Sequence, residues 1–284
     1  MLEFGNGRAE EKAAVPPLTS FFSVRVFRYL GPARVDCLGN GEVCFTPPFR
    51  FNDPFDLRPV FAPVTDRHYL KRMTRECLRV GESSVAGLGR AQKRKIEKQV
   101  GKEATAYYRE NAAKFADAYQ GPFQQKLNTY FGVLCFSTVN DNLLMWAHYA
   151  DSHKGFVLEF DTEDEQFRRL GDLHPITYDT NRPVLDPVKQ ITFDIYLRKS
   201  LDWQYEHEYR LVRPLQECEK RSLVAGEFYF VPMPRSCVKA VYLGTRMNEA
   251  LAKQILELMA GTSAEICETE LHPRQFSLVF KRIE

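Results

Sequence analysis

The segment Asp-Trp-Gln-Tyr-Glu-His-Glu-Tyr-Arg-Leu-Val, residues 202–212, sets charged and aromatic side chains in alternation. Such alternation is typical of a β-strand, in which successive side chains point to opposite faces. The pattern therefore predicts a strand with Glu206, Glu208 and Arg210 on one face and aromatic rings on the other. A solvated face with cross-strand ion pairs is the structural interpretation. A polar site on a sheet is the functional one.

Strand-like runs also occupy much of the chain on both sides of this segment. They cover residues 23–30, 41–46, 132–137, 155–160, 227–231, 238–243, 264–270 and 276–282. Helical spacing is found at 143–150, 189–200 and 248–259, and in a region at 66–130 that is rich in Lys, Arg, Glu, Ala and Gln. Breaks near 81–89 and at Gly121-Pro122 divide that region into two or three helices. We predict an α+β fold with a mostly antiparallel or mixed sheet, flanking helices and a helical insert at about 66–130. We expect one domain over 21–284, after a flexible arm at 1–20.

The bulk composition excludes several classes of protein. The chain has 284 residues and a net charge of +2, so no global field favours nucleic acid or an anionic membrane. No apolar run approaches the roughly 20 residues of a membrane helix, and residues 1–20 lack an apolar signal core. The seven cysteines form no Cys-x-x-Cys pair, which predicts reduced thiols. We expect a cytoplasmic protein with no membrane partner.

Basic residues gather inside the predicted insert. They are Lys93, Arg94, Lys95, Lys98 and Lys102. A solvated helix face is the favoured interpretation of such a run. A contact with nucleic acid is the alternative.

A second cluster, Met145 to Phe156, combines a tryptophan, two histidines and a tyrosine. In a helix that continues one turn past Ala150, His148 and Asp151 lie three residues apart, so the carboxylate would orient the imidazole. We expect Asn140 or Asp141 to cap this helix. Trp146, Tyr149 and His153 would share another face as an aromatic wall. The histidines of the cluster lie five residues apart and no His-Glu-x-x-His motif occurs, so we expect no metal.

The third cluster is Phe-Asn-Asp-Pro-Phe-Asp, residues 51–56. Asn52 and Asp53 precede a proline and favour a turn, because their side chains bond nearby backbone amides. A rigid turn after a strand also suits a loop that contacts a ligand. Dinucleotide, Walker, nucleophile-elbow and kinase motifs do not occur.

Taken in order, several motifs resemble a widespread microbial family that is catalogued as a domain of unknown function. The motifs are Val26 to Leu30, Phe51-Asn-Asp-Pro-Phe55, Leu134-Cys-Phe-Ser137, Met145-Trp-Ala-His-Tyr-Ala150 with Gly155-Phe156, and Trp203-x-x-Glu-x-Glu-x-Arg210. The resemblance covers about residues 22–283, apart from much of the helical insert. It brings no established activity.

The order of features is also similar to that of ADP-ribosyltransferases: an early strand with Arg or Tyr, an aromatic middle helix and a late strand with an essential glutamate. This resemblance implies NAD as co-substrate, a carboxylate that stabilises an oxocarbenium ion, and aromatic residues around nicotinamide. The Ser-Thr-Ser signature and an early-strand histidine are missing. On this basis the catalytic candidates are Glu208, Glu206 and His148, and the binding candidates are Arg28, Tyr29, Asn52, Asp53, Trp146, Tyr149 and Arg210.

Three functional hypotheses follow. The first is an enzyme that cleaves NAD and transfers ADP-ribose to a protein, a nucleic acid or water; it predicts a cleft joining Tyr29, Asn52, His148, Tyr149 and Glu208. The second is a module of a microbial defence system that binds a ligand or partner without turnover. The third is a hydrolase or nuclease that uses Asp53, Glu206, Glu208 and His148. The sequence does not decide between Glu206 and Glu208.

Overall fold

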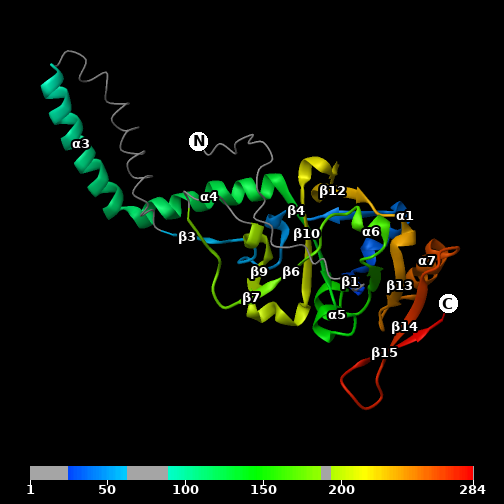
Figure 1. Cartoon of the computed structure of the whole chain (residues 1–284). Coiled ribbons are helices and arrows are strands. Elements are labelled where there is room, and N and C mark those ends of the chain that lie inside the picture. Colours follow the sequence, from blue (N-terminus) through cyan, green and yellow to red (C-terminus); the bar gives the residue numbers. More distant parts are fainter. Residues whose placement is uncertain (1–24, 63–88, 187–192, 284) are drawn as a thin grey trace.

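The computed structural model describes residues 25–62, 89–186 and 193–283 (Figure 1). The predicted arm at 1–20 and the first part of the predicted insert, 66–88, lie outside these ranges. The fold is α+β, as the sequence predicts.

An eight-stranded sheet forms the body of the molecule, in the order β15-β14-β13-β5-β1-β4-β10-β6. Its strands are β1 (Arg25–Leu30), β4 (Phe131–Ser137), β5 (Phe156–Asp161), β6 (His174–Pro175), β10 (Glu208–Pro214), β13 (Val238–Leu243), β14 (Glu265–Leu271) and β15 (Leu278–Arg282). Neighbouring strands are antiparallel except β13 and β14, which are parallel and are joined by helix α7 (Glu249–Met259). The sheet is therefore mixed and mostly antiparallel.

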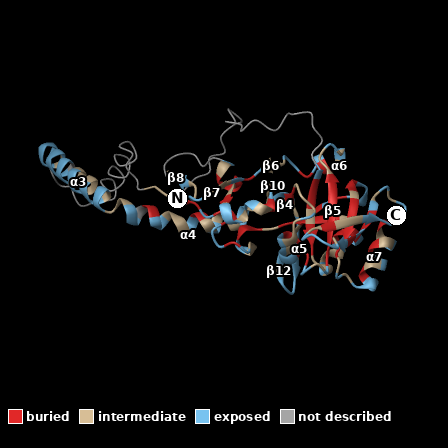
Figure 2. Ribbon diagram, turned by 90° about the horizontal axis from the view of Figure 1, so that it is seen from below, coloured by how far each residue is buried: buried red, intermediate tan, exposed pale blue. Residues whose placement is uncertain are grey.

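Alternating side chains give the sheet two apolar faces. On β1, Val26 and Leu30 belong to a core that includes residues of α1 (Asp36–Asn40), α6 (Glu165–Arg168) and α7. Phe27 and Tyr29 pack on the opposite face with residues of α5 (Leu143–Tyr149). Figure 2 shows the strands of this body as mostly buried. The period of two in the sequence thus places helices on both sides of the sheet.

Smaller sheets complete the fold. One has the order β11 (Glu219–Leu223), β12 (Gly226–Pro232) and β2 (Glu42–Phe45). Two parallel pairs join β3 (Val60–Phe61) to β8 (Val184–Leu185), and β7 (Thr177–Asp179) to β9 (Arg198–Ser200). Short 3₁₀ helices occupy Pro32–Val35, Pro48–Arg50, Phe193–Leu197, Leu201–Glu206, Leu215–Glu217 and Arg235–Cys237.

The described part of the helical insert is two long helices, α3 (Arg90–Glu110) and α4 (Ala112–Tyr130). They project from the sheet as an arm (Figure 1). The expected break at Gly121-Pro122 is wrong, because α4 continues through Pro122. Helix α4 ends where β4 begins, so the arm is continuous with a central strand of the sheet.

Four other expectations need correction. The helix predicted over 189–200 is wrong from residue 193 onward, where a 3₁₀ turn leads into β9. The strand predicted around Glu206 begins only at Glu208, because residues 201–206 form a 3₁₀ helix. Asn142, rather than Asn140 or Asp141, caps α5 by accepting bonds from the amides of Leu144 and Met145. The region between β5 and residue 186, for which no helix or strand was predicted, contains α6 and the short strands β6, β7 and β8.

No helix in the described part of the chain is long and apolar enough to cross a membrane. Cys37, Cys44, Cys135, Cys218, Cys237 and Cys267 are free thiols, while Cys77 lies outside the described residues.

Candidate functional site

The sheet opens between β1 and β4. These antiparallel strands share a single registered pair, Phe27 with Ser137. An unbroken ladder would go on to pair Arg28 with Phe136 and then Tyr29 with Cys135. The carbonyl oxygen of Cys135 instead accepts a hydrogen bond of 3.1 Å from the Arg28 guanidinium. A side chain from β1 thus takes the place of a backbone partner and stands in the gap.

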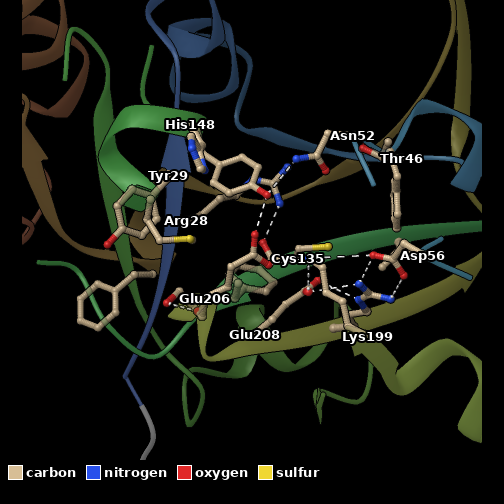
Figure 3. A pocket seen from close by; sticks show the side chains of 18 of the residues that line it. Arg28, Tyr29, Thr46, Asn52, Asp56, Cys135, His148, Lys199, Glu206 and Glu208 are labelled. Atoms are coloured by element: carbon tan, nitrogen blue, oxygen red, sulfur yellow. Dashed lines mark hydrogen bonds and ion pairs between the residues drawn. The ribbon is translucent and has the colours of Figure 1, made fainter. Parts of the chain in front are cut away.

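A pocket of about 400 Å³ lies at this opening, within the size range of small-molecule sites. Figure 3 shows polar side chains from both sides of the gap converging on it. Eight of the ten candidates from the sequence line it: Arg28, Tyr29, Asn52, His148, Tyr149, Glu206, Glu208 and Arg210. All five residues of the expected cleft are among them. Asp53 and Trp146 do not line the pocket.

Five buried ionisable side chains form one cluster beside the pocket: Asp56, Lys199, Glu206, Glu208 and Arg210. The Lys199 ammonium lies 2.5 Å from Glu206 Oε2 and 2.9 Å from Glu208 Oε2. The sequence predicted that Glu206 and Glu208 share one face of a strand. Instead, Glu206 lies in a 3₁₀ helix and Glu208 begins β10, and one lysine brings the two carboxylates together. Three carboxylates share two cations, so full ionisation would leave one excess negative charge.

Arg210 organises the other side of this cluster. Its Nε and one Nη bond the two oxygens of Glu208, at 2.7 and 3.1 Å. Its remaining donors bond both Asp56 oxygens and the Tyr196 carbonyl. All five guanidinium N–H donors thus have protein partners. Arg210 holds Glu208 and Asp56 in place and has no donor left for a ligand, although the sequence proposed it as a binding residue.

The two glutamates have opposite pKa shifts. Burial raises the pKa of Glu208, but Arg210 and Lys199 outweigh burial and bring it down to about 2. Burial is the largest influence on Glu206 as well, and there the pKa stays above its ordinary value despite Lys199. Glu208 is therefore the fixed anion, and Glu206 is the carboxyl that can carry a proton. A pair of carboxyls with divergent pKa values is typical of acid–base sites.

The low pKa of Glu208 predicts loss of stability in acid. The ordinary glutamate pKa is about 4.3, and the folded-state pKa of Glu208 is about 2. Because the folded pKa is the lower one, its stabilisation is present above about pH 4.3 and is lost as pH falls toward 2. Urea unfolding of wild type and Glu208→Gln across this window should show a steeper fall for wild type. Equal slopes would contradict the account. The raised pKa of Glu206 has the opposite effect: it lowers the free energy of unfolding as pH rises above the ordinary glutamate pKa.

Helix α5 brings two of its predicted residues to the pocket. Tyr149 donates a hydrogen bond of 2.5 Å to Glu206 Oε1 and accepts one of 3.1 Å from Asn52. His148 Nδ1 lies 3.0 Å from the Tyr205 hydroxyl. The expected orientation of His148 by Asp151 is wrong, because the Asp151 carboxylate lies 3.6 Å from Lys154.

Trp146 has a structural role. It is fully buried, donates from its indole nitrogen to the Asn140 carbonyl at 2.7 Å, and stacks on His153. The predicted wall of Trp146, Tyr149 and His153 is therefore not formed as one surface. Trp146 and His153 stack on each other and hold α5 in place, whereas Tyr149 faces the pocket. Gly155 permits this support, since an added Cβ would lie 2.0 Å from the Leu30 carbonyl oxygen.

The two polar residues of the Asn-Asp-Pro turn have different roles: Asp53 stabilises the turn, and Asn52 contacts a pocket residue. Asp53 Oδ1 accepts a bond of 2.8 Å from the Phe55 amide, as the turn interpretation expects. Asn52 instead reaches the pocket through Tyr149. Tyr29 lines the pocket and donates from its hydroxyl to the Val139 carbonyl at 2.9 Å.

The sequence did not point to Lys199, Asp56 or Arg50, which also line the pocket. Lys199 lay in a segment whose spacing predicted a helix, so nothing marked it. Asp56 is the last residue of the motif that contains Asn52 and Asp53. Its position after an apolar residue was the feature of the sequence that could have indicated it as a pocket residue. Arg50 lies over the Phe228 ring at 4.2 Å, and its buried Nε has no protein partner.

The segment that carries most of this cluster is also the one that a family model recognises. Residues 145–211 match the model of DUF2971, a family described as a protein of unknown function. The predicted family of unknown function is confirmed over this segment. The DUF2971 segment begins at α5 and ends inside β10, so it includes Tyr149, Lys199, Glu206, Glu208 and Arg210. The motifs at 26–30, 51–55 and 134–137 lie outside the match.

No curated protein and no solved structure matches the chain. Among the described residues, no group of three or more His, Cys, Asp or Glu side chains is arranged to hold a metal ion. The similarity to ADP-ribosyltransferases stays a prediction.

Proposed function

We propose that the protein cleaves the nicotinamide glycosidic bond of NAD and transfers ADP-ribose to a macromolecule or to water. The observation that carries the proposal is the pair of buried carboxyls, Glu206 and Glu208, which are joined by Lys199 and line a pocket that also contains Arg28. Cleavage of a glycosidic bond generates positive charge on the ribose, and a nearby carboxylate stabilises that charge.

Glu206 is the better candidate for the carboxyl that takes part in the reaction, because its raised pKa suits a general base that accepts a proton from the acceptor. Glu208 supplies fixed negative charge beside the pocket. One oxygen of Glu206 accepts a hydrogen bond from the Tyr149 hydroxyl and the other accepts one from Lys199. A substrate hydroxyl could take the place of Tyr149 as a donor to Glu206. Glu208 is tied to Arg210 through both oxygens. In the proposed step the C1′–N bond breaks and its electron pair passes to the nicotinamide nitrogen. The acceptor then bonds to C1′ and gives its proton to Glu206 or to water.

Arg28 is suited to the phosphates of the dinucleotide. Burial lowers its pKa, yet a guanidinium stays charged in proteins. No described carboxylate lies within ion-pair distance of it, and its hydrogen bond to the Cys135 carbonyl uses one donor. Planar guanidinium donors match phosphate oxygens. Aromatic side chains on the same pocket, Phe51 and Tyr149, suit the nicotinamide ring.

The test is steady-state release of nicotinamide from NAD, with nucleic acid and cell lysate offered as acceptors. We expect release by wild type, and an increase of about tenfold or more in KM for Arg28→Gln, since a charged hydrogen bond contributes about 1.5–3 kcal/mol. Arg25→Gln is the matched control, because Arg25 begins the same strand with 72% of its side chain exposed. An unchanged KM for Arg28→Gln would remove this residue from the site.

A binding module without turnover is the second candidate. It is favoured by the complete pairing within the cluster, where Arg210 has no unused donor. A purely structural ion network would have the same feature. NAD that binds the protein and is recovered intact would support this candidate over the first.

A further inference from the structure

Positive charge is concentrated on helix α3. Its 21 residues include seven basic and three acidic side chains, a formal charge of +4. The whole chain has a net charge of +2, which leaves −2 for the remainder. The near-neutral net charge of the whole chain is therefore the sum of a strongly basic helix and a remainder with a slight negative charge.

Five of the seven basic residues of α3 lie on one side. Arg94, Lys98 and Lys102 follow at intervals of four residues, and Lys95 and Arg109 fall within the same arc of about 100° at 3.6 residues per turn. All five are exposed. At 1.5 Å per residue the row is about 22 Å long. We call these five residues the α3 basic row.

Several exposed basic residues of the body have carboxylate partners, whereas the basic row has none among the described side chains. On the body, Arg168 lies beside Glu163, Arg169 is 2.7 Å from Glu165, and Lys281 is 2.6 Å from Glu270. Among the side chains that the structure describes, no carboxylate lies within ion-pair distance of any member of the row. The row also stands away from the sheet, on the projecting arm (Figure 1), and Figure 2 shows α3 as largely exposed.

We propose that the α3 basic row binds the phosphate backbone of nucleic acid. A row of cations about 22 Å long can neutralise several successive phosphates, and release of their counterions drives such binding. A membrane surface suits the helix less well, because an interfacial helix needs a broad apolar face. Ile96 and Tyr107 are the large hydrophobic side chains that the described part of α3 exposes. The interaction is independent of turnover in the pocket.

The experiment is fluorescence anisotropy of a labelled mixed-sequence duplex, with the full chain at increasing salt. Five phosphate contacts predict a loss in affinity of about 500-fold between about 50 and 200 mM salt. Arg94→Gln/Lys98→Gln/Lys102→Gln leaves two contacts and predicts a loss of about 12-fold over the same range. Circular dichroism checks that the variant keeps its helices, and glutamine has a helix propensity close to that of the residues it replaces.

The matched control is Arg168→Gln/Arg169→Gln/Lys281→Gln, which removes the same charge from the body and should keep the wild-type salt dependence. Four results would overturn the proposal: no binding to the duplex, binding that salt does not weaken, an equal effect of the control, or preference for phosphatidylserine vesicles over the duplex. None of these results depends on whether the protein cleaves NAD.

Discussion

Glu206→Gln is expected to lower the rate of nicotinamide release by about 10²-fold or more, the usual contribution of a positioned acid–base group. The fold should be kept, because the pKa of Glu206 is raised by burial and the site disfavours its charge. The glutamine oxygen can still accept the hydrogen bond from Lys199, and its NH2 group can donate to the Tyr149 hydroxyl oxygen. The measurements are nicotinamide release and thermal unfolding on the same preparations.

Glu208→Gln tests whether the two glutamates have different roles. The Glu208 carboxylate bonds Arg210 and Lys199, so the substitution should lower the free energy of unfolding as well as activity. Glu163→Gln, on the exposed surface, is the control for the chemical change itself. If Glu206→Gln retains turnover while Glu208→Gln loses it with an unchanged Tm, the roles given to the two glutamates are wrong.

Arg210→Met is expected to destabilise the protein by about 3–5 kcal/mol, the usual loss when one partner of a buried ion pair is removed. The side chain is fully buried and supplies five hydrogen bonds. Without it, Asp56 and Glu208 would share only Lys199 as a nearby cation. Urea unfolding measures the change in the free energy of unfolding.

The control for Arg210→Met is Arg168→Met, on an arginine whose side chain is 59% exposed. A surface substitution of this kind should change the free energy of unfolding by about 0.5 kcal/mol or less. Equal unfolding curves for Arg210→Met and Arg168→Met would show that the buried cluster is not the stabilising network described here.

Short-range patterns in the sequence predicted most of the sheet. Alternation located β1, and short, mostly apolar runs located β4, β5 and β13, because these central strands are buried on both faces. Alternation misplaced Glu206, since its neighbours also alternate between charged and aromatic residues. His207 ends the 3₁₀ helix with a φ of 45°, and a left-handed residue other than glycine leaves no mark in the sequence.

The site depended on long-range contacts that local patterns do not contain. Lys199 belongs to β9, and pairing of β9 with β7 replaced the expected helix from residue 198 onward. The gap between β1 and β4 results from strands 110 residues apart losing register after one pair, Phe27 with Ser137. Residue types still predicted much of the pocket lining, because buried charged side chains next to aromatic rings are rare enough to indicate a functional site.

The most direct test is a single-turnover experiment with the protein in excess over NAD labelled separately in its nicotinamide and adenine halves. The account predicts that the nicotinamide label is released and that the adenine label remains with ADP-ribose, either free or on an added acceptor. Glu206→Gln should leave both labels in intact NAD. Intact NAD with the wild-type protein, in the presence of lysate and nucleic acid, would contradict the proposed glycosidic chemistry.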